Sequence, residues 1–123
     1  MAGSIAVTSS DIGGGTTKYS VAWTSDASGN VSGNTFDIKR GALIQTVFLP
    51  GTGGSQPSNG YTAAVNDANA IDVLFGAGAG LSNAVGSYNL PSTPALLEGQ
   101  TVTPVISNAG NAKGGTIILY VWL

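Results

Sequence analysis

Short stretches in which apolar and polar residues alternate recur along this chain, and glycine, proline, asparagine or aspartate bounds each of them. Tyr19, Val21 and Trp23 form one such series. A period of two residues places alternate side chains on opposite faces of a strand. Candidate helices at 77–85 and 94–98 are rich in glycine or proline and span no more than about two turns. The pattern predicts an all-β, single-domain, antiparallel β-sandwich of jelly-roll-like form.

The turn signals divide the chain into expected strands. Asn59-Gly60 is the strongest turn signal, at the end of a loop of about a dozen residues rich in glycine and proline. The alternation on either side of that loop predicts a hairpin at 19–36, an extended stretch at 35–49 that bends or bulges at Gly41, a second hairpin at 61–75, and strands at 101–107 and 116–123.

The C-terminal segment is apolar on both of its expected faces. Ile117, Leu119 and Val121 alternate with Ile118, Tyr120 and Trp122. Such a strand has to be covered on both sides. Either a packed loop covers the second face, or the face that carries Tyr120 and Trp122 lies in a subunit interface, where aromatic residues are enriched.

The N-terminal segment is expected to form an extended arm over residues 1–16, followed by a β-sandwich domain over residues 17–123. Gly13-Gly14-Gly15 serves in this hypothesis as a flexible link. Ile5, Ala6 and Val7 are then free to add a strand to an exposed sheet edge of a neighbour. Interface residues are therefore expected at Ile5, Ala6, Val7, Tyr120 and Trp122.

The composition argues against catalysis. Among 123 residues there are 4 Lys+Arg and 6 Asp+Glu, charged residues make up 8 %, and histidine and cysteine do not occur. Ser-His-Asp and Cys-His catalysis are thus excluded, as are disulfides and zinc sites built on cysteine or histidine. No enzyme activity, cofactor or metal is expected. The weak, slightly acidic charge also disfavours nucleic acid as a partner.

No membrane partner or targeting segment is expected either. The longest apolar run, Ile117 to Leu123, is far shorter than the about 20 residues of a spanning helix. The N-terminus lacks the basic and apolar regions of a signal peptide. We therefore expect assembly inside a cell, without secretion.

Three segments resemble known ligand-binding motifs but do not match them. Residues 76–81 lack the third glycine of a dinucleotide-binding turn, and Lys18 leads into a strand where a phosphate-binding loop requires a helix. Asp67, Asn69 and Asp72 supply oxygen ligands, but without the spacing of a calcium loop. A turn stabilised by the aspartate and asparagine side chains is the preferred interpretation of this cluster, ahead of a cation site or a glycosidase-type acid pair.

Four segments resemble a known group of proteins. They are residues 21–33 (VAWTSDASGNVSG), 61–67 (YTAAVND), 70–79 (AIDVLFGAGA) and 106–116 (ISNAGNAKGGT). In this order they resemble the head decoration, or cement, proteins of tailed bacteriophages. The ending Val121-Trp122-Leu123 departs from the basic ending associated with that family.

The resemblance implies a structural virion protein made and assembled in the host cytoplasm. Such a protein is a compact β domain that binds the outer surface of the capsid as a homodimer or homotrimer. Its partner is the major capsid protein, and it stabilises contacts between neighbouring capsid subunits. The alternative hypothesis is a phage tail or receptor-binding β module that stacks host glycans on Tyr61, Tyr88 or Trp23.

Overall fold

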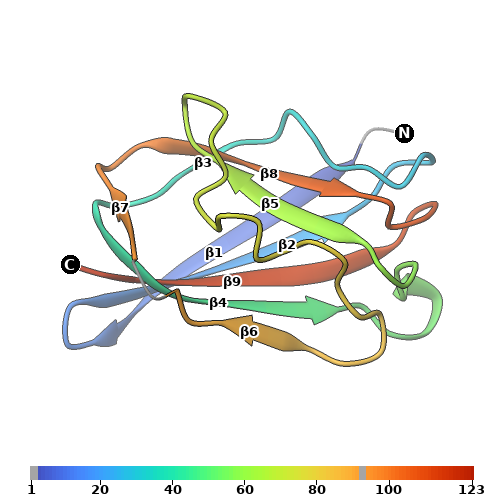
Figure 1. The fold of residues 1–123 in the computed structure, drawn as a ribbon, viewed down its shortest axis with the longest axis horizontal. Coiled ribbons are helices and arrows are strands. Elements are labelled where there is room, and N and C mark those ends of the chain that lie inside the picture. The colour runs from blue at the N-terminus through green and yellow to red at the C-terminus, as the bar shows by residue number, and fades with distance from the viewer. Residues whose placement is uncertain (1–2, 92–93) are drawn as a thin grey trace.

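A computed structural model describes residues 3–91 and 94–123 (Figure 1). Nearly all of its regular structure is β-strand, apart from a single 3₁₀ turn, η1 (Gly53–Ser55), in the long loop after the fourth strand. The strands are β1 (Ser4–Gly13), β2 (Thr16–Thr24), β3 (Phe36–Asp37), β4 (Gly41–Pro50), β5 (Thr62–Asn66), β6 (Ser87–Asn89), β7 (Ala95–Leu97), β8 (Thr101–Ser107) and β9 (Gly114–Trp122).

The strands form two antiparallel sheets that pack face to face. The large sheet has the order β1-β2-β9-β4-β6, with β7 also paired to β4, and the small sheet has the order β3-β8-β5. Figure 1 shows the small sheet lying across the large one. The predicted all-β sandwich is confirmed, and jelly-roll connectivity stays a prediction.

Alternate residues of both sheets meet in one core. Val21 of β2 and Leu119 of β9 point from the large sheet, and Val65 of β5 and Ile106 of β8 point from the small one. All four are buried. The two-residue period of the sequence therefore reports burial correctly wherever a strand is regular.

The segment expected to be a separate arm is part of the large sheet. β1 pairs with β2 from Ser4 opposite Thr24 to Gly13 opposite Thr16. Gly14 and Gly15 have φ values of 63° and 80° and form the two-residue turn between the strands. Such a turn requires positive φ at both positions, and glycine adopts it without steric cost. The glycines thus connect a hairpin instead of releasing an arm, which corrects the expectation for residues 4–16; residues 1–2 lie outside the described residues.

The hairpin expected at 19–36 does not form. β1 and β9 occupy the two sides of β2, so no side is left for residues 31–36. The Asp26 carboxylate instead accepts hydrogen bonds from the backbone N–H groups of Ser28 and Asn30, both at 2.9 Å, and closes a turn. The chain then crosses to the small sheet, where Val31 bridges Ile106.

The bend expected at Gly41 is present: residues 38–40 lead from β3 of the small sheet to β4 of the large sheet, which begins at Gly41. β4 also contains a bulge, which the sequence did not indicate. Leu43 and Gln45 oppose consecutive residues of β9, so Ile44 is the extra residue. A bulge of this kind shifts the alternation by one. Thr46 and Phe48 consequently point inward with Leu43, whereas uninterrupted alternation places them on the face of Ile44.

Three other expected elements differ in the structure. Only the first half of the hairpin at 61–75 is a strand, because the Asp72 carboxylate accepts hydrogen bonds from the N–H groups of Val65 and Leu74 and holds residues 72–75 in turns. Residues 94–98, a candidate helix, contain β7, and residues 77–85 contain turns and bends in place of a helix. Pairing with β4 is what makes 95–97 a strand.

One buried hydroxyl lacks a partner. The Thr46 side chain is only 1 % exposed, and its Oγ1 has no hydrogen-bond partner among the described residues. We expect Thr46→Val to raise the free energy of unfolding by about 1 kcal/mol, because it replaces this hydroxyl with a methyl group of similar size. Urea denaturation measures the change.

The matched control is Thr17→Val. Thr17 is also buried, but its Oγ1 donates a hydrogen bond to the Asp11 carboxylate at 3.0 Å. This substitution should lower the free energy of unfolding by about 1 kcal/mol. Equal destabilisation by both substitutions would contradict the assignment of Thr46 as an unsatisfied group.

Candidate interaction face

The outer face of the large sheet carries many apolar side chains, among which Gln45 of β4, opposite Tyr120, is polar. Residues that oppose each other across neighbouring strands share a face. Trp122 of β9 opposes Ala42 of β4, and Ala42 in turn opposes Leu96 of β7. A second row joins residues of β9, β4 and β6 in the same way. We call this group the outer patch: Ile44, Val47, Leu49, Tyr88, Leu96, Ile118, Tyr120 and Trp122.

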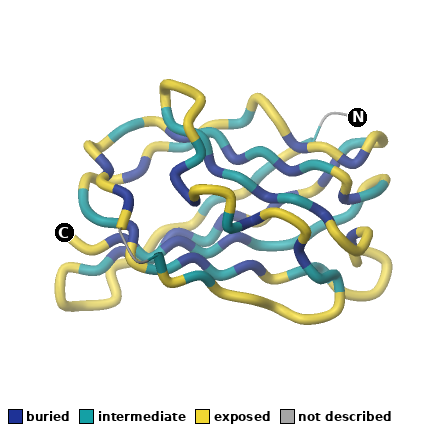
Figure 2. Tube along the Cα trace, in the orientation of Figure 1, coloured by how far each residue is buried: buried dark blue, intermediate teal, exposed yellow. Residues whose placement is uncertain are grey.

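Several members of the outer patch are well exposed. Leu96 is 82 %, Tyr88 67 % and Trp122 53 % exposed. The other half of the same face, on β1 and β2, carries small or hydroxyl side chains and a lysine: Ser4, Ala6, Thr8, Ser10, Lys18, Ser20, Ala22 and Thr24. Figure 2 shows intermediate and exposed positions alternating with buried ones along the strands. Apart from Ile12, which is exposed near the end of β1, the large apolar side chains of this face lie on the β4, β6, β7 and β9 side, and clustered apolar residues of this kind mark interaction sites.

The second face of the C-terminal strand was expected to be covered either by a packed loop of the same chain or by another subunit. The structure tests the first possibility. β9 lies between β2 and β4, and its inward residues are buried. Tyr120 is half-buried and Trp122 is exposed, so the chain itself does not fully cover the outer face. The indole Nε1 of Trp122 donates a hydrogen bond to the Gly14 carbonyl at 3.1 Å, which holds the ring beside the β1–β2 turn.

The five expected interface residues do not form one cluster. Tyr120 and Trp122 belong to the outer patch. Ala6 lies on the same outer face but on β1, with β2 in between, and Ile5 and Val7 point inward and pack against the core. Their participation in an interface stays a prediction.

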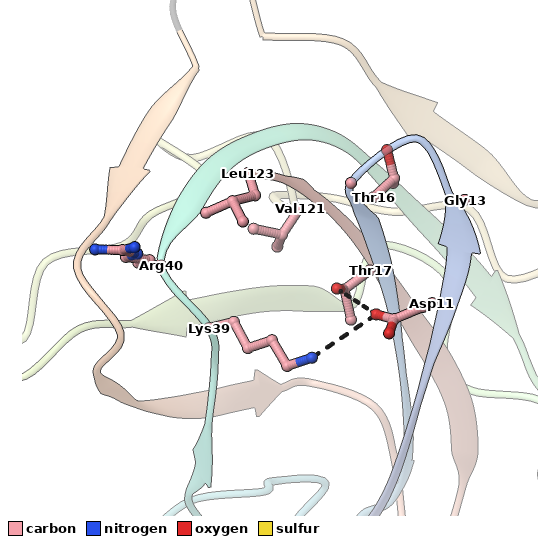
Figure 3. A pocket seen from close by; sticks show the side chains of 9 residues that line it. Asp11, Gly13, Thr16, Thr17, Lys39, Arg40, Val121 and Leu123 are labelled. Carbon is pink, nitrogen blue, oxygen red and sulfur yellow. Dashed lines mark hydrogen bonds and ion pairs between the residues drawn. The ribbon is translucent and has the colours of Figure 1, made fainter.

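A pocket of about 530 Å³, which the sequence did not indicate, opens at one end of the sandwich (Figure 3). Val121 and Leu123 supply its apolar wall. Nζ of Lys39 lies 3.7 Å from the carboxylate of Asp11, and both side chains are well exposed. An exposed pair of this kind contributes little to stability. The pocket presents charged groups of both signs on its rim.

The acidic cluster at 67–72 serves the backbone. Asp67 accepts hydrogen bonds from the N–H groups of Asn69 and Ile71, at 2.8 and 3.0 Å. Asp72 accepts bonds from Val65, Leu74 and Gly76. The predicted turn stabilised by these side chains is confirmed. Within residues 3–91 and 94–123, no group of three or more acidic side chains is placed to hold a metal ion.

Two of the three candidate glycan-stacking aromatics are buried. Trp23 and Tyr61 pack on each other in the core with ring centroids 5.6 Å apart. Only Tyr88 is exposed, and it belongs to the outer patch. Trp23 and Tyr61 are therefore wrong as surface stacking platforms.

Burial raises the pKa of the Tyr61 phenol above its usual value of 10.0. The pKa of this phenol is therefore higher in the folded than in the unfolded protein. Its contribution to the free energy of unfolding is fully present below pH 10 and is lost as the pH rises above that value. We expect the free energy of unfolding to fall from about pH 9 to about pH 11, and to fall less steeply in Tyr61→Phe. Denaturation at several pH values measures both slopes. Tyr88→Phe is the exposed control, and identical slopes for Tyr61→Phe and the unaltered chain would contradict this assignment.

No helix in the described part of the chain is long and apolar enough to cross a membrane. No family model matches the chain, and no match is found among curated proteins or among solved structures.

Proposed function

We propose that this chain is a structural virion protein of a tailed bacteriophage, of the decoration or cement type. It binds the outer surface of the capsid and stabilises contacts between major capsid subunits. The observation that carries the proposal is the outer patch, an apolar surface that the chain leaves partly or fully exposed. The resemblance of four sequence segments to head decoration proteins supports the same assignment.

The chemistry of the outer patch suits attachment to another protein. Interface cores are depleted in charge and enriched in aromatic residues. The patch contains no charged residue and includes Tyr88, Tyr120 and Trp122. Full burial of one such side chain contributes about 1.5–3 kcal/mol. Burial of several of them therefore favours association, and hydrogen bonding of β9 on both sides limits the ordering cost.

The proposal explains why the chain has so few charged residues. A soluble monomer normally keeps its surface hydrated with charged side chains. This chain carries 4 Lys+Arg and 6 Asp+Glu among 123 residues. A subunit whose apolar face is covered in a capsid lattice needs fewer of them. In this proposal the protein acts by burying its apolar surface against the capsid. The proposal therefore assigns no catalytic residue and no cofactor.

A glycan-binding tail module is the less favoured function. Burial of Trp23 and Tyr61 leaves Tyr88 as the accessible member of the three aromatics suggested for it. Glycan sites combine aromatic platforms with polar groups that orient the sugar. Tyr88 instead has apolar neighbours on the outer face, such as Val47.

Binding to capsids that lack this protein tests the proposal. We expect the unaltered chain to co-sediment with such capsids. The double variant Tyr88→Ser, Leu96→Ser should bind at least about tenfold more weakly, because it removes apolar area equivalent to more than about 1.4 kcal/mol. Both side chains are exposed, so the fold should persist, which circular dichroism verifies.

The matched control is Ile71→Ser. Ile71 is an exposed aliphatic residue in the turn after β5, away from the outer patch. This variant should bind capsids as tightly as the unaltered chain. Absence of capsid binding by the unaltered chain, together with glycan binding that Tyr88→Ala abolishes, would replace the proposal with the tail-module function.

A further inference from the structure

The longest free backbone edge of the molecule is β1. This strand has ten residues and pairs on one side only, with β2. No backbone hydrogen bond joins residues 4–12 to any described segment other than β2. The outward-facing N–H and C=O groups of β1 are thus available for pairing with another strand.

The other sheet edges are short or covered. β6 and β7 have three residues each, and β3 has two. The free side of β5 is covered by residues 71–81, through hydrogen bonds from Val73 N–H to the Val65 carbonyl, from Ala63 N–H to the Gly78 carbonyl and from Leu81 N–H to the Tyr61 carbonyl. Gly78 permits this approach, because a Cβ there would clash with the Ala63 carbonyl.

Over residues 4–10, β1 lacks the features that normally protect an exposed edge; its charged residue, Asp11, comes later. Lysine, proline and early bulges discourage strand pairing. The strand has no lysine or proline, and its only register shift comes at its end, between Asp11 and Gly13. Ile5 and Val7 point inward but are only half-buried, so a neighbouring strand would complete their burial.

We propose that β1 pairs antiparallel with β1 of a second copy of this chain, across a two-fold axis perpendicular to the sheet. Inward-pointing residues of β1, such as Ile5 and Val7, have odd numbers. An inward residue of one copy therefore opposes an inward residue of the other only in registers where the two opposed residue numbers add to an even number. The favoured register places Ile5 opposite Val7 of the second copy. Ala6 then lies opposite Ala6 of the second copy on the outer face.

This register is the one that the side chains of β1 favour. It forms two apolar pairs on the core side, and Ser4 opposes Thr8 of the second copy on the outer side, where hydroxyl pairs are favourable. In this register Asp11 opposes neither Ile5 nor Val7 of the second copy. A register centred on Thr8 would place Ile5 opposite Asp11 and is therefore disfavoured.

The pairing has a consequence for the proposed function. An isologous contact of this kind closes after two copies and makes a dimer. Because the two-fold axis is perpendicular to the sheet, both outer patches face the same side. One dimer then attaches at two points, which raises its effective affinity for a repeating surface. The β1 pairing itself does not depend on capsid attachment.

The chain contains no cysteine, so single introduced cysteines test the register directly. In Ala6→Cys, the two Cα atoms would be about 4.5–5.5 Å apart, within the range that a disulfide spans. In Thr8→Cys, the two copies of residue 8 are offset by four residues, about 13 Å. Both positions are exposed.

We expect analytical ultracentrifugation to show a dimer of the unaltered chain. Under mild oxidation, Ala6→Cys should form the covalent dimer at least tenfold faster than Thr8→Cys. Equal rates, no covalent dimer, or a monomer at micromolar concentration would overturn the proposal. Capsids take no part in these measurements, so their outcome is separate from that of the capsid-binding test.

A charge exchange at Ala6 provides a second test. Ala6→Asp and Ala6→Lys each place like charges opposite each other and should raise the dimer dissociation constant about fivefold. An equimolar mixture of the two variants should restore dimers as mixed pairs, which mass spectrometry under native conditions identifies. The proposal is wrong if mixing leaves the two variants as separate species.

Discussion

β9 is hydrogen-bonded on both sides, and this pairing joins the two halves of the large sheet. β2 and β4 flank this strand over most of its length. Its inward residues Ile117, Leu119 and Val121 are buried beneath the small sheet, so its outward residues Ile118, Tyr120 and Trp122 have to project from the opposite face. The burial that stabilises the sandwich thereby also places these three apolar side chains on the outer face. Moving a residue of β9 from one face to the other would require a one-residue shift in its pairing with β2 and β4.

The two halves of the large sheet differ in chemistry because they have different neighbours. On the β4, β6, β7 and β9 side, apolar residues occupy both faces, and only the inner face has a partner within the chain. On the β1 side, the outer residues from Ser4 to Ser10 are small or polar, and the available interaction is the backbone edge. Side-chain burial and strand pairing are separate sources of association free energy. A single molecule with both can join two different kinds of neighbour.

Several features could be predicted from sequence because they depend on local chemistry. Asp67 and Asp72 bind nearby N–H groups, and the loop at 50–60 contains the glycine and proline that prevent a strand. The alternation of Tyr19, Val21 and Trp23 correctly indicated one buried face. The pairing of β1 was missed because its alternation has only two large apolar residues before serine and aspartate take their place. The signal that could have found it was Gly14-Gly15, which favours a two-residue hairpin turn.

Side-chain period and local backbone preferences were enough to predict the all-β class, the positions of most turns and the two-faced apolar character of the last strand. Tertiary pairing was needed to establish which strands are neighbours, that Val31 crosses to the small sheet, and that a bulge at Ile44 turns Thr46 inward. Tyr88 and Leu96 join Trp122 on one surface for the same reason. Strand pairing connects residues far apart in the chain, and its free energy depends on competition among all strands, which no local pattern records.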